Sequence, residues 1–371
     1  MKKVLATLIL AAPSLALAQA PAVPTLDKIL EASGITMTGY IDAAYTHANR
    51  DIEGGFSPRV FDSYNNSFVL HQVGLQIAKQ PKQGVGGLVN VTAGRDATLI
   101  HSFPDGSTST FDITQGYLQY ATGPLTVIGG KFTTLHGMEV IWSPGNANYS
   151  RSILFGAEPF THTGLRATYA LSDAFSLIGG INNGWDQLVD ANKGKTLELG
   201  VTATPIKPLS LAASYYGGQE PSTITGTNGR RDSFDFTGIW KLSDPLSVGL
   251  EVLRVSQEDA VPNGSGGTKS ATYTGIAGYL SWTFMPKMKL SMRAEAFDDK
   301  DGFHFPVAAA AAGTTGTKHR ELTTTVAWLA ADNFELRGEV RADRADQSVY
   351  SDGGGFSKTL TTFAVQGLYK F

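Results

Sequence analysis

Residues 333–343 alternate between two chemically opposite faces, and no other feature of the sequence constrains the fold as strongly. In an extended strand, successive side chains point to opposite sides, so every second residue shares a face. One face carries Phe334, Leu336, Gly338, Val340 and Ala342, and the other carries Glu335, Arg337, Glu339, Arg341 and Asp343. A soluble β-sandwich or propeller needs an apolar interior and a polar exterior. An uncharged face opposite a fully charged one instead suits a barrel with lipid outside and water inside.

Segments of roughly ten residues with this alternation recur about every 22 residues, the spacing expected of a meander of membrane-crossing strands. Their connections alternate between tight and long along the chain. The tight ones are Gln80–Gly84, 122–124, 172–173, Pro205–Pro208, 243–245, 286–287 and 332–333, and the long ones are 95–111, 133–160, 183–193, 218–230, 257–270, 299–318 and 344–357. The pattern predicts an all-β fold, a transmembrane antiparallel up-and-down β-barrel of about 16 strands (roughly 14 to 18). We expect short periplasmic turns and long outer loops.

Two segments leave the assignment of faces open, and with it the strand count by one hairpin. Residues 125–132 show no clear alternation. In residues 246–255, Glu251 shares a face with the apolar Leu253. Either segment could therefore turn its charged or its apolar side inward.

Both ends of the chain fit export to the outer membrane. Lys2 and Lys3 precede an apolar run that ends in small residues, which predicts a signal peptide over 1–20, cleaved after Ala18 or Ala20. We expect residues 21–34 to form a periplasmic segment with a short helix over 25–33, its apolar residues inward, and the barrel to span 35–371. The end of the chain carries Phe363, Val365, Tyr369 and Phe371 on one face. This ending, with Phe371 last, resembles the assembly signal through which outer-membrane barrels engage the barrel-assembly machinery.

Composition narrows the class further. The formal net charge is −3, with both signs scattered along the chain, so no basic surface for nucleic acid is indicated. No segment after the predicted signal supplies the ~18 apolar residues of a membrane helix. The absence of cysteine fits an exported protein in an oxidising compartment. We expect contact with outer-membrane lipid and lipopolysaccharide, and no cofactor.

The longest connection, 133–160, is the third long one. The layout resembles that of sixteen-stranded general porins, whose third outer loop folds into the barrel and narrows it, so we expect a constriction loop here. Opposed charges in a narrow aqueous throat can select and orient solutes. The alternative for each charge is an interior ion pair that stiffens the wall. The pore-lining candidates are Glu139, Arg151, Glu158, Arg166, Arg293, Glu295, Arg337, Glu339, Arg341 and Asp343.

Several stretches in order along the chain are similar to the β-barrel porin-2 (OmpL-like) family. They are 130–133 with Gly137 and Glu139, 162–166, 183–186 with Asn192 and Lys195, 293–295 with Asp298, Asp299, Asp301 and Gly302, and 339–343. The resemblance implies an outer-membrane barrel with a channel role. By resemblance to sixteen-stranded porins, a homotrimer is also expected. No solute follows from it.

Catalytic and metal-binding alternatives find little support. His71 falls on the apolar phase of residues 68–79, but Ser67 on the same face is ~13 Å away along a strand, far beyond the ~3 Å that proton transfer requires. The other histidines, His101, His136, His162, His304 and His319, lie in or beside the expected outer loops, where we expect them solvated. No catalytic residue is predicted. Asp298, Asp299 and Asp301 resemble part of a calcium loop, but Ala308 stands where the twelfth-position acid would be.

Two functions therefore remain. The first is a porin through which small hydrophilic solutes or ions diffuse passively along a water-filled lumen lined by mixed charge. The second is a barrel with a plugged lumen that acts as an adhesin, an envelope scaffold or an outer-membrane enzyme. The solute, the sign of ion selectivity and the oligomeric state do not follow from the sequence.

Overall fold

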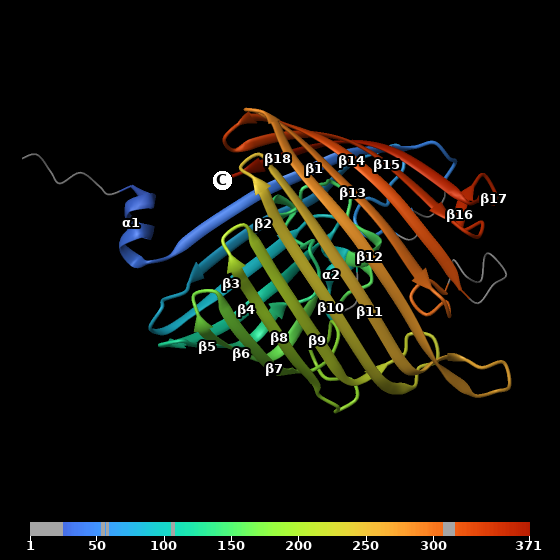
Figure 1. Cartoon of the computed structure of the whole chain (residues 1–371), viewed down its shortest axis with the longest axis horizontal. Helices are drawn as coiled ribbons and strands as arrows, with labels where there is room; N and C mark the ends of the chain where they lie inside the picture. The colour runs from blue at the N-terminus through green and yellow to red at the C-terminus, as the bar shows by residue number, and fades with distance from the viewer. Residues whose placement is uncertain (1–24, 53–55, 57–58, 105–107, 307–315) are drawn as a thin grey trace, which may run out of the picture.

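The computed structural model describes residues 25–52, 56, 59–104, 108–306 and 316–371, so the predicted signal peptide lies outside the described residues. Within that part of the chain, sixteen strands form one closed barrel (Figure 1). These strands are β1 (Thr36–Ala48), β2 (Ser67–Lys79), β3 (Gly84–Ala93), β4 (Phe111–Thr122), β5 (Leu125–Thr133), β6 (Thr161–Ser172), β7 (Phe175–Asn182), β8 (Thr196–Ile206), β9 (Leu209–Pro221), β10 (Asn228–Ser243), β11 (Leu246–Pro262), β12 (Thr268–Met285), β13 (Met288–Asp299), β14 (Thr317–Ala331), β15 (Phe334–Ala345) and β18 (Thr359–Lys370).

Each barrel strand pairs antiparallel with its neighbours, and β1 closes the barrel by pairing with β18. At the seam, Phe371 exchanges backbone hydrogen bonds with Gly39, at 2.8 and 2.9 Å. The side chain of Phe371 covers the backbone of Gly39, because a Cβ there would lie 2.4 Å from its ring. The predicted antiparallel barrel and its sixteen strands are confirmed, and tight turns alternate with longer outer connections, two of which are shorter than predicted.

The two faces of β15 are arranged as its sequence predicts. Phe334, Leu336 and Val340 are exposed on the outside, whereas every charged residue of the opposite face is buried inside the barrel. Alternation across the sheet accounts for this pattern. Large apolar side chains are also exposed on the outer faces of the other strands, as a lipid-facing surface requires.

Strands β9 to β12 run further into the outer connections than the sequence indicates. The predicted long connection over 218–230 is mostly strand, because β9 continues to Pro221 and β10 begins at Asn228. Likewise, β11 and β12 leave only 263–267 between them, and Figure 1 shows this hairpin extending beyond the neighbouring loops. The connection over 344–357 contains a small hairpin of β16 (Tyr350–Asp352) and β17 (Gly355–Ser357).

The helix α1 (Leu26–Ser33) precedes the barrel, as predicted, and it projects away from the barrel in Figure 1. It ends at Gly34, whose φ of +67° is favourable for glycine. Leu26 and Ile29 are exposed, so the expectation that they point inward is wrong. None of the helices in the described ranges is both long and apolar enough to span a membrane.

An irregularity in β2 reverses the expected side of His71. Gln72 pairs with Asp42 and Leu70 with Ala43, so His71 is an extra residue at a β-bulge. His71 and Gln72 consequently both point into the barrel, where they are buried. The assignment of His71 to the apolar outer phase is therefore wrong.

Candidate functional site

The connection between β5 and β6, residues 134–160, crosses the interior of the barrel and is here called the inner loop. It contains a short 3₁₀-helix, η1 (Ser143–Gly145), and a single helical turn, α3 (Ile153–Gly156). Ile153 and Leu154 of α3 are fully buried against the inner sides of β11 to β13. Their partners on β11 include Leu253 and Val255. This packing resolves the ambiguous assignment of faces in β11. Glu251 and Leu253 share the inward face, and Leu253 is buried there because it packs against the apolar side chains of the inner loop.

The first part of the inner loop is fixed to β9, β10 and β11 by hydrogen bonds. His136 Nδ1 lies 2.7 Å from Ser214 Oγ, and the backbone N–H of Leu135 donates to Tyr216 Oη at 2.9 Å. Two further N–H groups, of Gly137 and Met138, donate to the carboxylates of Asp235 and Glu251.

The middle of the inner loop reaches β1, β2 and the β13–β15 wall. Ser143 Oγ donates to Asp42 Oδ2 at 2.6 Å, and Tyr149 Oη lies 2.8 Å from His71 Nε2. Glu339 of β15 accepts from the backbone N–H groups of Tyr149 and Ser150, at 2.7 and 3.0 Å. The loop is therefore bonded to widely separated parts of the wall.

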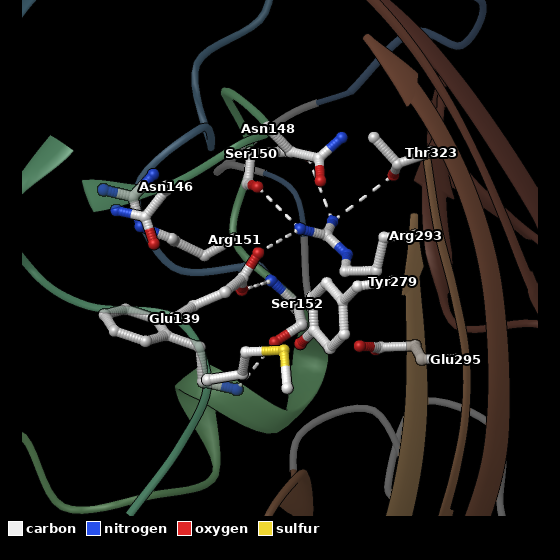
Figure 2. Close-up of polar contacts among 12 residues, drawn as sticks. Glu139, Asn146, Asn148, Ser150, Arg151, Ser152, Tyr279, Arg293, Glu295 and Thr323 are labelled. Atoms are coloured by element: carbon white, nitrogen blue, oxygen red, sulfur yellow. Dashed lines mark hydrogen bonds and ion pairs between the residues drawn. The ribbon is translucent and has the colours of Figure 1, made fainter. Parts of the chain in front are cut away.

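Arg293 is the charged centre of the contact between the inner loop and the β13–β15 wall (Figure 2). Its guanidinium donates to Glu139 Oε1 at 2.6 Å and to the carbonyl oxygen of Ser150 at 2.7 Å. On the wall side it donates to Glu321 Oε1 at 2.7 Å. Arg293 is fully buried. Charge-assisted hydrogen bonds of this kind are stronger than neutral ones, and removing one member would leave a buried charge uncompensated.

The two inward arginines of β15 are paired in the same way. Arg337 binds Glu335 at 2.8 Å. Arg341 binds Asp343 at 2.8 Å and donates to the carbonyl oxygen of Arg151 at 2.6 Å. Asp343 also binds Arg59 from the first outer loop. The charged face of β15 thus holds loop segments in place.

Arg151 stabilises the inner loop itself. Its guanidinium donates to the carbonyl oxygens of Val140, Tyr149 and Ile141, at 3.1, 2.9 and 3.2 Å. Its charge also lies over the rings of Phe61 and Phe155, which supply cation–π contacts.

All ten predicted pore-lining residues lie inside the barrel, and all except Arg166 are buried. Arg166 pairs with Glu198 of β8 and lies 4.2 Å from the centre of the Phe132 ring. Glu295 accepts the backbone N–H of Ile153 at 2.7 Å. Most of these charges hold the inner loop against the wall, and their contact with a passing solute stays a prediction.

A chamber of about 740 Å³ separates the inner loop from the opposite wall, which is formed by β2 to β5. The wall contributes uncharged polar groups, namely Gln76, Asn90, Thr114, Gln115 and Thr133. The loop contributes mainly apolar and aromatic groups, among them Ile141, Trp142, Phe155 and Phe160. Among the described residues, Glu139 and Glu158 are the carboxylates in its lining.

The chamber adjoins a second hollow at the end of the barrel that holds the short turns. Gln76 and Trp142 border both spaces, and the second hollow, of about 1060 Å³, also reaches Asn333, Lys370 and Phe371. On its other side the chamber meets an apolar cluster from three outer loops. This outer-loop cluster consists of Phe61, Ile100 of α2 (Ala97–Ile100), Ile141 and Phe155.

The histidines expected in solvent are mostly buried. His136 and His162 pack against the ring of Tyr216, and burial lowers the pKa of His136 well below its usual range. His319 is also buried. His101 pairs with Asp112 at 3.1 Å. The expectation of solvated histidines is therefore wrong for the buried residues, because outer loops fold over them.

The three aspartates of the predicted calcium-like loop face different partners. Asp298 pairs with Lys318 at 3.0 Å, and Asp301 pairs with Lys269 at 3.1 Å. Asp299 accepts the backbone N–H groups of Phe303 and Phe305. Within the described ranges, the acids that do converge are a different set, Glu158, Asp235 and Glu251.

Sequence reasoning missed the polar wall of the chamber and this acidic set. Gln76 and Asn90 follow the inward phase of β2 and β3, so alternation alone could have placed them inside, whereas Thr114 is the extra residue at a β-bulge in β4 and shares its phase with the exposed Leu118. Their facing an open space depends on where the inner loop lies. No sequence signal indicated that arrangement.

A family model described as "Putative beta-barrel porin-2, OmpL-like" matches residues 34–371. Among solved structures, the fold is similar to the outer membrane channel DcaP of Acinetobacter baumannii, with a TM-score of 0.62, 16% identity, and coverage of 91% of this chain and 97% of that one. It is also similar to an anion-selective porin from Comamonas acidovorans (TM-score 0.60, 13% identity, 91% and 99% coverage). A third similar structure is the trimer form of OmpT from Vibrio cholerae, with a TM-score of 0.61, 12% identity, and coverage of 91% of this chain and 99% of that one. No curated protein sequence matches the chain.

Proposed function

This chain belongs to the beta-barrel porin-2, OmpL-like family and is a porin of the bacterial outer membrane, and we propose that it passes small uncharged hydrophilic solutes down their concentration gradients. The pathway runs through the chamber between the inner loop and the β2–β5 wall. This proposal is narrower than the sequence expectation, which allowed ions and a lining of mixed charge.

The observation that carries the proposal is the separation of charge from open space. Arg293, Arg337 and Arg341 are paired with carboxylates and buried on the β13–β15 side. The hollow side offers amides and hydroxyls opposite aromatic rings. Such groups can hydrogen-bond a hydroxylated solute and pack against its apolar face. These wall groups carry no fixed charge, and the carboxylates in the chamber lining, Glu139 and Glu158, belong to the inner loop.

Liposome swelling tests the proposal. Vesicles that contain the refolded barrel should swell in uncharged sugars at rates that fall with sugar size, and a salt gradient across a planar bilayer should give a reversal potential near zero. A strongly signed reversal potential would contradict an uncharged pathway. The outer-loop cluster favours the alternative function, a plugged barrel, because its apolar side chains close one side of the chamber. If a folded barrel gave neither swelling nor conductance, the plugged barrel would be supported.

We propose, further, that the barrel forms a homotrimer, that it contacts lipopolysaccharide and that its end at Phe371 engages the barrel-assembly machinery. A neighbouring structure is described as a trimer form, which motivates the first point. Chemical crosslinking in detergent would test it. Deleting Phe371 should slow membrane assembly. Residues 21–34 are proposed to lie in the periplasm, and no enzymatic role is proposed.

A further inference from the structure

Three carboxylates from three separate segments converge inside the barrel. Glu158 comes from the end of the inner loop, Asp235 from β10 and Glu251 from β11. Their nearest oxygens all lie within 4.8 Å of one another. All three side chains are buried, with residue exposures of 5, 2 and 1%. We call this group the acidic triad.

Each member of the acidic triad has one oxygen without a hydrogen-bond partner: Glu158 Oε1, Asp235 Oδ2 and Glu251 Oε1. The two wall residues use their other oxygen for the inner loop and a neighbouring strand. Asp235 accepts from the Gly137 N–H at 3.1 Å, and Glu251 accepts from the Met138 N–H at 3.2 Å and from Tyr279 Oη at 2.9 Å. Buried polar atoms normally find a partner, so three orphaned oxygens in one place need an explanation.

The triad also differs from several other interior acids in charge balance. Glu139, Glu198 and Glu335 each form an ion pair with an arginine. Among the described residues, no lysine or arginine forms an ion pair with a triad member. Burial and then the neighbouring carboxylates of Glu251 and Asp235 raise the pKa of Glu158 well above its usual range. Isolated buried carboxylates are costly unless a countercharge or a proton compensates them.

We propose that the acidic triad binds one divalent cation of the hard, oxygen-preferring class, with Ca²⁺ as its best representative. Two oxygens that bind one Ca²⁺ at about 2.4 Å each can be at most about 4.8 Å apart, and the triad meets this limit. Three carboxylates leave coordination positions for water, which the adjoining chamber can supply because Glu158 borders it. The converging group contains carboxylates and no histidine, so the donors are all oxygen.

The bound cation would fasten the end of the inner loop to β10 and β11. Gly137 shows how closely the segments approach here, because its φ is +90° and a Cβ would lie 2.2 Å from Glu158 Oε2. Removal of the ion would leave three carboxylates to repel one another or take up protons. The loop end would then separate from the wall. This inference does not depend on which solute the porin passes.

Terbium luminescence with the full-length refolded barrel is the direct test, because Tb³⁺ replaces Ca²⁺ at oxygen sites and Tyr279, which touches Glu251, can sensitise its emission. We expect saturable Tb³⁺ emission, which Ca²⁺ should reduce by displacing the Tb³⁺ ion. We also expect Ca²⁺ to raise the midpoint temperature of thermal unfolding. Glu251→Gln and Asp235→Asn should abolish both effects. Asp298→Asn, which alters an acid near the end of β13 that pairs with Lys318, is the matched control and should retain them.

Two results would overturn the proposal. One is the absence of saturable emission from the folded barrel at neutral pH, which would mean that protons compensate the acids. The other is equal emission from wild type and Glu251→Gln. If a wall variant fails to fold, Glu158→Gln serves instead, because its substitution lies in the loop. Tyr279→Phe should weaken the emission while calorimetry still detects Ca²⁺ binding, which locates the ion beside this tyrosine.

Discussion

The two sides of the lumen have the same alternating strand pattern but carry different inward side chains. Along β13 to β15, inward residues are charged, paired and pressed against the inner loop, and Arg293 at the centre is inaccessible to solvent. Along β2 to β5, the inward residues that line the chamber are amides and hydroxyls. The charged residues of β13 to β15 therefore hold the inner loop, whereas the uncharged polar residues of β2 to β5 border open space. A charged inner face is not by itself a pore lining.

Removing the central arginine should have the largest effect on this contrast. Arg293→Met leaves Glu139 buried without its countercharge and leaves Glu321 with only Arg341, at 3.6 Å, and breaking a buried ion pair in this way costs about 3–5 kcal/mol. We expect a lower free energy of unfolding in urea and noisier single-channel conductance as the loop loosens. Lys318→Met, which removes an exposed partner of Asp298, is the control and should change stability little. Unchanged stability of Arg293→Met would show that the paired side does not hold the loop.

Filling the hollow side should block transport without comparable loss of stability. Gln76 and Trp142 border both the chamber and the hollow behind it. Gln76→Trp should therefore lower the rate of liposome swelling in sugars several-fold, whereas Trp142→Ala should raise it. Ser281→Trp places the same bulk in a different cavity, of about 620 Å³ beside Asn148, and should leave the rate nearly unchanged. Equal inhibition by both tryptophans would place the pathway elsewhere.

Adding a charge to the hollow side should create an ion selectivity that the proposed uncharged pathway does not provide. Gln115→Lys should shift the reversal potential in a salt gradient toward anions, and Gln115→Glu should shift it toward cations, because a fixed charge in a narrow passage selects its counter-ion. Asp244→Asn removes a fully exposed charge in a short turn, where salt screens it, and should shift the potential little. Shifts of the same sign for both Gln115 variants would contradict the assignment of Gln115 to the wall of the pathway.

The smallest expected effect is a pH dependence at the end of the inner loop. Asp186, between β7 and β8, accepts the backbone N–H groups of Phe160 and Thr161 at 2.8 and 2.9 Å. Burial raises the pKa of Asp186 from 3.8 to about 6. The folded state therefore binds the proton more tightly, and its stability should increase as pH falls from 7 to 5, by about 1.3 kcal/mol.

Comparison of the wild type with Asp186→Asn isolates this contribution, because other groups also titrate in that range. The difference between their free energies of unfolding, measured in urea at pH 7 and pH 5, should change with pH in the stated direction. A pH-independent difference would show that Asp186 does not carry the effect.

Local alternation was sufficient to predict the barrel, because each strand carries its own lipid-facing and interior residues. It failed at His71, where a bulge shifts the phase by one residue, and it left Glu251 and Leu253 unresolved. Leu253 points inward because Leu154, far away in the sequence, supplies an apolar partner.

The candidate site depends on long-range pairs of this kind. The sequence shows that Arg293 and Glu139 are charged, but their pairing depends on how the inner loop folds across the lumen. The chamber beside Gln76 and Asn90 is likewise the space that this loop leaves unfilled. A period-two pattern contains neither the register between distant segments nor the path of a loop.

The attachment of the inner loop to distant strands also has a mechanical consequence. A thin-walled cylinder resists stretching along its circumference but flattens readily when squeezed from the side. A strut bonded to β9 through Leu135, to β1 through Ser143 and to β15 through Tyr149 opposes such flattening in more than one direction. Lateral pressure from the surrounding bilayer would then load these hydrogen bonds in series, and the cross-section of the barrel would be set as much by its brace as by its wall.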